Sequence, residues 1–320
     1  MSEILQERTM NYDSFVSAMK QIIEVRMGDG YDISIYKVIK NNSLELDSLV
    51  VLQEGRNIAP NIYLMPYYES YLEGTAIDEV ADRLCGVYQN GSVQNVDDDF
   101  SYTLKEMKPY IFYRLVSFDK NIKLLENVPH IKYLDLAITF HCLVRSDEDG
   151  IGTIRITNEH MKLWDVSLGD LKELAVANTE RLFPANIKSM EEVLMGMLSS
   201  DLVLADGDNP MADLSPKLID DLKNPCQHEM YILTNQKGIN GASCMLYGDI
   251  IRTFANHINS DLYILPSSIH EILLVPQTPD MKIESLTKMV EEVNQTQVAR
   301  EEVLSDNVYY FSRELNSIIL

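Results

Sequence analysis

Closely spaced cysteines, long apolar runs and an excess of basic residues are all missing from this 320-residue chain. The four cysteines show no C-x-x-C pair, so the sequence holds neither a disulfide framework nor a zinc knuckle. No apolar run approaches the ~18 residues that a membrane-crossing helix needs. Residues 1–10 lack the basic start and apolar core of a signal peptide. We therefore expect a cytoplasmic protein whose thiols are reduced.

Basic side chains are scarce, because 27 Lys and Arg stand against 49 Asp and Glu, which gives a net charge of −22. Affinity for phosphates rests on Lys and Arg, so we expect no binding to nucleic-acid backbones and none to membranes. The acids are scattered, with short clusters at 97–99 and 147–149. Solubility is the interpretation that we favour for this charge, and a basic partner is an alternative. Mimicry of DNA is a distant alternative that requires the acids to line one face.

Motifs of nucleotide and metal chemistry are absent as well. The chain has no G-x-x-x-x-G-K-[ST] and no G-x-G-x-x-G. Cys226 and His228 could supply two metal ligands, but no second pair at suitable spacing accompanies them. Residues 206–209 resemble the start of a calcium loop, yet Lys217 stands where the closing glutamate belongs. We expect no cofactor and no bound metal.

The composition is that of an ordinary globular protein, with 46% hydrophobic and 24% charged residues. We predict an α+β fold with mostly antiparallel sheets covered by helices. The length allows two or three domains. The predicted segments are an N-terminal region at 1–92, a middle region at 93–200, an acidic linker or loop at 201–225 and a C-terminal region at 226–320.

The N-terminal region predicts a helix, three strands and a helix. Apolar residues at helical spacing precede Gly28 and Gly30, which end the first helix. Strands are predicted at 31–39, 44–52 and 58–65, the first two joined by a tight hairpin at Asn41-Asn42, and a helix capped by Thr75 and Asp78 ends at Gly91. A double-stranded RNA-binding domain has the same order, but no basic cluster precedes the last helix.

A tyrosine-rich turn is predicted after the third of these strands. It places four tyrosines within nine residues: Tyr63, Tyr67, Tyr68 and Tyr71. Tyrosine is favoured in protein interfaces, so these residues are a candidate interaction surface. The alternative is a tyrosine-rich edge of the core.

The middle region predicts strands at 110–116, 134–145 and 152–156. Three helix starts follow them. Their capping residues are Thr157, Ser167 with Asp170, and Ser189 with Glu192.

The C-terminal region is organised around residues 261–276, two apolar runs separated by Pro-Ser-Ser. Pro266 ends the first run, and Asp280 is a candidate cap for the following helix. This unit of strand, strand and helix has a second copy 32 residues upstream, with strands at 231–235 and 242–246 and a helix capped by Asp249. We expect one sheet with both helices on the same face, and a last strand at 307–311.

The 261–276 stretch also holds candidate catalytic residues. His270 could act as a base for Ser267 or Ser268, or pair with Cys244, because His is the commonest acid–base group near neutral pH. On a predicted strand, His270 and Glu271 would point to opposite faces. The stretch contains no H-E-x-x-H and no G-x-S-x-G, and serines after proline are common turn residues.

Six strings across nearly the whole chain resemble an uncharacterised bacterial family that is known only as a domain of unknown function. They lie at 45–64, 133–144, 156–184, 231–242, 263–276 and 301–314. The segment 164–184 and the tail after Glu291 also resemble a second uncharacterised bacterial family. Neither resemblance implies an activity. Both imply a bacterial cytoplasmic protein.

Two classes of function remain. The absence of any coherent motif favours a non-enzymatic binding or regulatory accessory protein with an unknown protein partner. The alternative is a hydrolase-like enzyme, which requires Ser267 or Cys244 within hydrogen-bond reach of His270 in a pocket.

Overall fold

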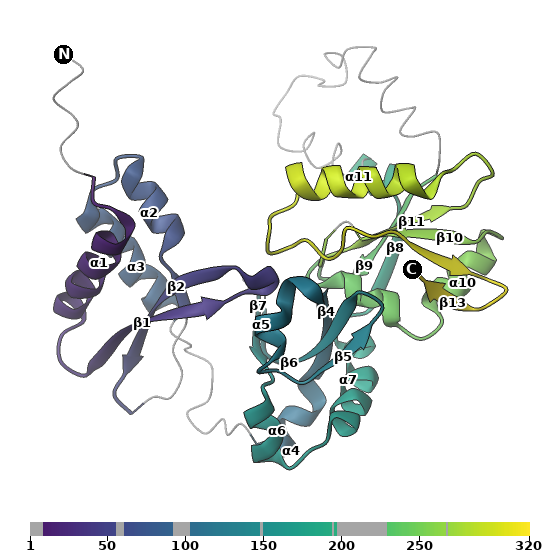
Figure 1. Cartoon of the computed structure of the whole chain (residues 1–320). Coiled ribbons are helices and arrows are strands. Elements are labelled where there is room, and N and C mark those ends of the chain that lie inside the picture. The colour runs from purple at the N-terminus through teal and green to yellow at the C-terminus, as the bar shows by residue number, and fades with distance from the viewer. Residues whose placement is uncertain are drawn as a thin grey trace, which may run out of the picture. The chain divides into compact units, whose positions relative to one another are not determined.

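The computed structural model describes residues 9–55, 61–91, 103–147, 150–193, 195–196, 229–266 and 268–320 (Figure 1). The chain divides into two compact units, Met1–Ser101 and Tyr102–Leu320. Both units contain antiparallel sheets and helices, so the predicted α+β class is confirmed. The predicted linker at 201–225 lies outside the described residues, as do Cys226 and His228. Among the described helices, none combines the length and the apolar character that crossing a membrane requires.

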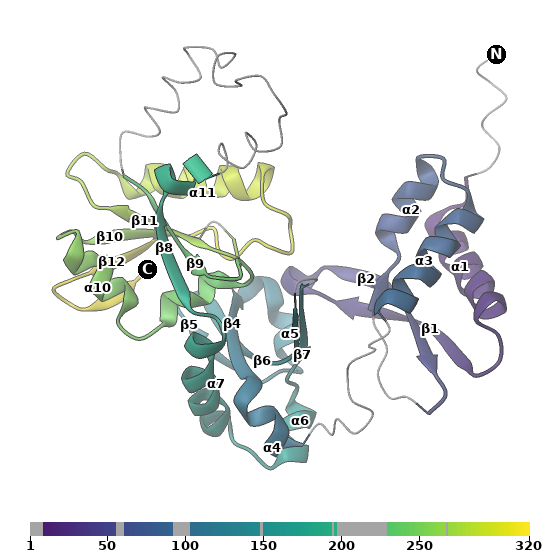
Figure 2. The same cartoon turned by 180° about the vertical axis from the view of Figure 1, so that it is seen from behind.

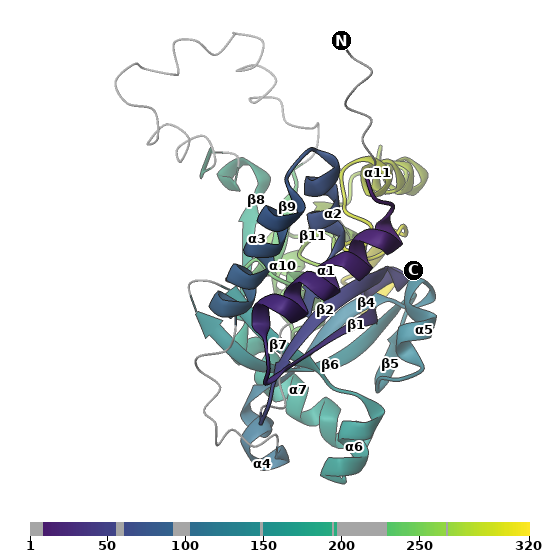
Figure 3. The same ribbon diagram turned by 90° about the vertical axis from the view of Figure 1, so that its left-hand side faces the viewer.

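The first unit is a three-stranded antiparallel sheet with three helices, in the strand order β1-β2-β3. Its elements are α1 (Tyr12–Met27), β1 (Tyr31–Ile39), β2 (Glu45–Gln53), β3 (Asn61–Tyr63), α2 (Met65–Leu72) and α3 (Ile77–Gly91). Helix α1 runs across the sheet (Figure 3), because Phe15, Met19 and Ile23 recur at helical spacing and are buried against it. Leu84 of α3 belongs to the same core.

The hairpin between β1 and β2 is confirmed at the predicted turn. Lys40 N donates to Leu44 O at 2.8 Å, and Asn42 adopts a φ of 57°. Asparagine tolerates this left-handed conformation better than most residues, so the Asn-Asn sequence permits the reversal. The two strands then pair along their whole length, from Tyr31 opposite Gln53 to Ile39 opposite Glu45.

The predicted tyrosine-rich turn is a helix, α2. Pro66 lies in its first turn, where a missing N–H costs nothing, so a helix can start directly after the strand. Tyr68 OH donates to Met10 O at 3.0 Å, and Met10 N donates to Tyr71 OH at 3.1 Å. Tyr67, like these two, packs against the core of the first unit. These three candidate interface residues therefore contact their own unit.

The second unit contains two antiparallel sheets. The four-stranded sheet is built on a long strand, β6 (Leu136–Asp147), which pairs with β4 (Ile111–Ser117) along one edge. Its other edge is shared by β5 (His130–Tyr133) and β7 (Gly150–Arg155). The helical elements of this part are α4 (Leu104–Met107), η2 (Lys108–Tyr110), η3 (Asp119–Asn121), α5 (Ile122–Leu125), α6 (Asn158–Trp164) and α7 (Leu168–Leu182).

The predicted caps of α6 and α7 are confirmed. Thr157 accepts from His160 N, and Ser167 accepts from Asp170 N, each with a reciprocal bond that completes a capping box. At the third predicted cap, Ser189 N donates to Glu192 Oε2 at 2.9 Å and Glu192 N donates to Ser189 Oγ at 3.1 Å.

The six-stranded sheet has the order β13-β12-β10-β11-β9-β8 (Figure 2). Its strands are β8 (Ala185–Ser189), β9 (Tyr231–Asn235), β10 (Leu262–Leu265), β11 (Ile272–Pro276), β12 (Tyr309–Ser312) and β13 (Ser317–Ile319). Its helical elements are η5 (Gly241–Leu246), α10 (Ile250–His257) and α11 (Ile283–Thr296). The predicted unit of strand, strand and helix is present as β10, β11 and α11. However, α11 begins after Lys282, so Asp280 is not its cap.

The predicted upstream copy is wrong in its second strand, because residues 241–246 form the 3-10 helix η5. A Cβ on Gly241 would lie 2.1 Å from Thr234 Oγ1 and 2.5 Å from His270 O, so the backbone passes too close to its neighbours for any side chain. Asn240 precedes it with a φ of 53°. The position therefore requires glycine, and the segment that starts there coils into a 3-10 helix instead of pairing as a strand.

The expectation that both helices share one face of the sheet is also wrong. Leu265 and Val275 lie on one face and belong to a cluster with Leu286 and Val290 of α11. Tyr231 stands opposite Leu274, on the other face, and its ring lies 4.8 Å from that of Phe254 in α10. Helices α11 and α10 therefore cover opposite faces (Figure 1).

Candidate functional site

The free edge of β4 is closed by side chains instead of a further strand. Tyr113 N donates to Thr179 Oγ1 at 3.1 Å, and Leu115 N donates to Ser243 Oγ at 3.3 Å. Asn178 Nδ2 donates to Ile111 O at 3.0 Å. Because unpaired edge groups invite pairing with other chains, these three bonds from α7 and η5 protect the edge and satisfy its buried backbone.

A small cavity lies at this edge, inside the second unit. Residues from β4, β7, η5 and the loop before η5 line it, among them Phe112, Arg114, Ile151, Asn240, Ser243 and Tyr247. Its volume is about 10 Å³, close to the minimum that one water molecule occupies. The cavity therefore accepts a single small polar atom, with larger groups remaining at its mouth.

Arg114 is the charged residue of the cavity wall. Its Nη2 donates to Thr153 Oγ1 at 3.2 Å, and its guanidinium lies 5.1 Å from the centre of the Phe112 ring. Its Nε is buried and has no hydrogen-bond partner. Burial, with a smaller effect of the Arg155 charge, lowers the pKa of Arg114 to about 10. The guanidinium is therefore still charged at neutral pH.

His141 lies beside Arg114 on the same sheet. It is 5% exposed, and its Nε2 is 3.2 Å from Thr139 Oγ1. Burial first, then the charges of Arg114 and Arg155, hold the pKa of His141 well below its usual value of 6.5. His141 is therefore neutral at pH 7 and leaves the positive charge to the arginines.

The strand register places these groups on one face. Arg114 stands opposite Thr139, Phe112 opposite His141, and His141 opposite Arg155. Side chains alternate between faces along a strand, so Phe112 and Arg114 point to the same side of β4. The result is a partly buried basic face in a chain whose net charge is −22.

The structure places His270 in the loop before β11 and not on the predicted strand. Asn240 N donates to His270 Nδ1 at 3.2 Å, which puts the proton of a neutral ring on Nε2. His270 Nε2 lies 3.4 Å from Glu302 Oε1. Both ring nitrogens therefore contact neighbouring segments, and His270 links the start of η5 to the loop around Glu302.

The candidate nucleophiles are arranged differently from the prediction. Ser267 lies outside the described residues. Ser268 Oγ accepts from the backbone N of His270 at 3.0 Å, and the imidazole faces Asn240 and Glu302. Cys244 is fully buried in η5, and burial raises the pKa of its thiol to about 12. A group that stays a thiol at neutral pH is a poor nucleophile.

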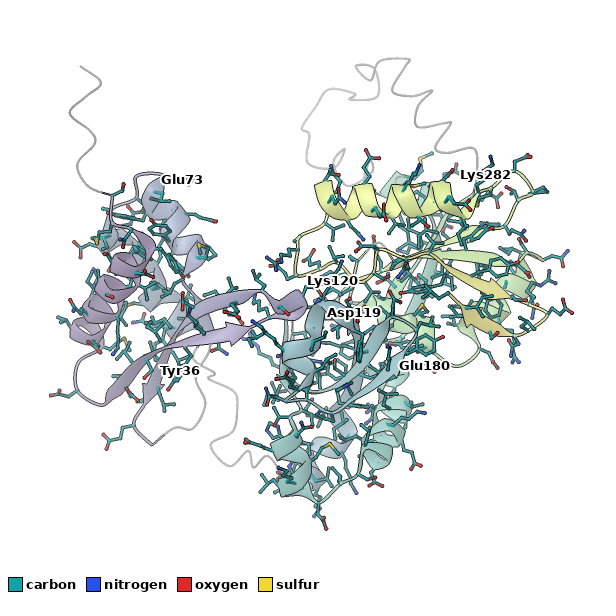
Figure 4. The ribbon with its side chains drawn as sticks, in the orientation of Figure 1. Tyr36, Glu73, Asp119, Lys120, Glu180 and Lys282 are labelled. Atoms are coloured by element: carbon teal, nitrogen blue, oxygen red, sulfur yellow. The ribbon has the colours of Figure 1, made fainter. Side chains whose placement is uncertain are left out.

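Glu180 of α7, labelled in Figure 4, adds a negative charge near this thiol. The charge acts in the same direction as burial, against the thiolate.

In the described part of the chain, no group of three or more His, Cys, Asp or Glu residues could hold a metal ion.

A polar junction ties the four-stranded sheet to the C-terminal segment. Asp135 accepts from Ser305 Oγ at 2.6 Å and from Tyr309 OH at 2.7 Å. Lys120, labelled in Figure 4, pairs with Asp306 at 2.8 Å. These bonds join residues more than 160 positions apart, so their role is to hold the two sheets together.

Arg114 is not among the site residues that the sequence patterns predict. A signal for the arginine was present, because Arg114 interrupts an apolar run at 110–116. An arginine inside a buried strand needs a partner, and a strand pattern alone does not say which residue that partner is.

The fold and this site define an α+β protein of two units, with a partly buried basic face beside a small cavity. The chain belongs to the family described as "Family of unknown function (DUF5688)", whose model matches residues 12–313. This confirms the resemblance to a domain-of-unknown-function family over nearly the full length. No curated protein and no solved structure matches the chain.

Proposed function

We propose that this chain is a non-enzymatic binding or regulatory accessory protein of the bacterial cytoplasm, acting on a protein partner. The observation that supports the proposal is the state of the candidate catalytic groups. His270 Nδ1 already accepts a backbone N–H, so it has no lone pair left to take a proton from a serine or cysteine. The thiol of Cys244 is buried and protonated.

The free cysteines support the proposed cytoplasmic location. Cys85, Cys142 and Cys244 are free, which is the usual state of cysteines in a reducing compartment. The bacterial origin rests on the resemblance of the sequence strings.

Affinity capture from the lysate of the host tests the proposal, with wild type and His270→Ala carrying the same tag. Glu302→Gln is the matched control, because it keeps the size of the side chain that His270 Nε2 faces and removes its charge. We expect all three forms to retain the same stoichiometric protein partner. Capture of no protein, together with a small molecule altered or retained by wild type alone, would overturn the proposal.

The hydrolase-like alternative keeps one observation in its favour. The side chain of His270 is 31% exposed and stands 3.4 Å from a carboxylate, the arrangement that orients a catalytic histidine. A fluorophosphonate probe, which labels activated serines, separates the two functions. The binding function predicts no labelling of Ser267 or Ser268. Labelling that disappears in His270→Ala would establish the hydrolase.

A further inference from the structure

Arg114 is a charged side chain whose hydrogen-bonding capacity is only partly used by the described residues. Its hydrogen-bond partner within the described residues is the neutral hydroxyl of Thr153, and its buried Nε donates to nothing. Its charged neighbour is another arginine, Arg155. A buried donor without an acceptor costs free energy, so an acceptor placed at Nε would stabilise Arg114.

The cavity supplies the place for that partner. Arg114 lines it, and so does Ser243, which is 3% exposed. Ser243 Oγ accepts from Leu115 N, so its own proton is free to donate to a second acceptor. A guanidinium side chain and a hydroxyl side chain are thus both among the residues that line a space fitting a single oxygen atom.

We propose that this cavity binds one oxygen of a small oxyanion, a carboxylate or a phosphate, through Arg114 Nε and the hydroxyl of Ser243. The remainder of the anion lies at the cavity mouth, since the volume of about 10 Å³ admits one oxygen. Guanidinium groups suit both classes of anion, because their N–H donors match the oxygens of carboxylates and phosphates. The inference goes beyond the proposed function, since an oxyanion can occupy the cavity whether or not a protein partner binds.

Titration calorimetry of the full chain with acetate, inorganic phosphate and chloride, at matched ionic strength, tests the site. We expect one saturable site for acetate or for phosphate, with no saturable binding of chloride. Arg114→Met should weaken this binding about tenfold or more. Arg252→Met is the matched control, because it removes the same charge from an exposed pair with Asp249, and it should bind like wild type.

The Arg114 Nε–H resonance of the wild type gives a second readout that does not depend on the variant folding. Binding should shift this resonance and slow its exchange with water. Acetate alone producing the shift identifies a carboxylate site, and phosphate alone identifies a phosphate site. Equal binding by Arg114→Met, or an Nε–H resonance that neither anion shifts, would overturn the proposal and leave water as the occupant.

Discussion

At the scale of single residues, the basic face of the four-stranded sheet sets the chemistry of its neighbours. Burial lowers the pKa of His141, and the charges of Arg114 and Arg155 add to the effect. The same environment lowers the pKa of Arg114. The environment of the sheet thus lowers the pKa of both Arg114 and His141 and favours their neutral forms. The stability of the folded sheet therefore depends on pH.

The first prediction concerns His141 and acid. In the unfolded chain its pKa is about 6.5, whereas in the folded chain it is well below that value. Below pH 6.5 the unfolded state therefore binds a proton that the folded state does not, so stability falls as the pH falls. The slope is at most about 1.4 kcal/mol per pH unit for one group.

His141→Gln removes this titration while keeping a polar side chain beside Thr139. Urea unfolding at pH 7.5, 6.5 and 5.5 should show a wild type that loses more stability than the variant between pH 6.5 and 5.5. The expected difference is about 1 kcal/mol. Parallel pH profiles of the two proteins would contradict a depressed pKa at His141.

At the scale of elements, the free edge of β4 depends on two hydroxyls. Thr179→Val keeps the shape of the side chain but leaves the buried N–H of Tyr113 without an acceptor. We expect this to lower the free energy of unfolding by about 1–3 kcal/mol. Thr179 Oγ1 also donates to Ala175 O, four residues earlier in α7, at 2.5 Å.

Thr287→Val is the control for that second bond. Thr287 Oγ1 makes the same bond four residues back, to Ile283 O at 3.0 Å. The Thr287→Val substitution should lower the free energy of unfolding by no more than about 0.5 kcal/mol. Equal losses in the two variants, measured by urea unfolding, would show that the contact with β4 contributes nothing.

The next prediction concerns the close approach at Gly241. Gly241→Ala would bring a Cβ within 2.7 Å of Asn235 N and 2.5 Å of His270 O, both backbone atoms that cannot rotate away. We expect a loss of more than about 3 kcal/mol, since relief requires η5 or the neighbouring loop to move.

Gly169→Ala in α7 is the matched control in the same unit. The nearest atom to its new Cβ is Ser167 Oγ at 3.5 Å, which is ordinary contact. It should be neutral or slightly stabilising, because alanine favours helix over glycine. Thermal unfolding of both variants checks the pair. Equal stability of Gly241→Ala and Gly169→Ala would contradict the close approach of Gly241 to the backbone of Asn235 and His270.

Some elements of the fold could be predicted from the sequence, and others could not. The strands at 31–39 and 44–52 were predictable because Asn41-Asn42 carries its turn in its own residues. The capping boxes at Thr157 and Ser167 are equally local. The segment 242–246 has a strand-like composition, but the backbone before it packs closely against Thr234 and His270, which lie outside the segment. The basic face likewise arises from pairing between β4, β6 and β7, which no local pattern encodes.

At the scale of the whole molecule, each compact unit has a core of its own. The first unit buries Phe15, Met19 and Leu84 in one cluster. In the second unit, α11 packs on the six-stranded sheet through a separate cluster that includes Leu286 and Val290. Clusters that share no residue can lose packing independently, so a core substitution in one unit should leave the other intact.

Leu84→Ala tests this independence in the full chain. Leu84 is 1% exposed, so the substitution should cost about 2–5 kcal/mol in the first unit. Hydrogen exchange followed by mass spectrometry should show faster exchange of amides in α1, β1, β2 and α3, and unchanged exchange in β10, β11 and α11. Val290→Ala, at a 5% exposed position of α11, is the reciprocal variant and should reverse the pattern. Exchange that accelerates equally in both units after either substitution would mean that they unfold as one cooperative body.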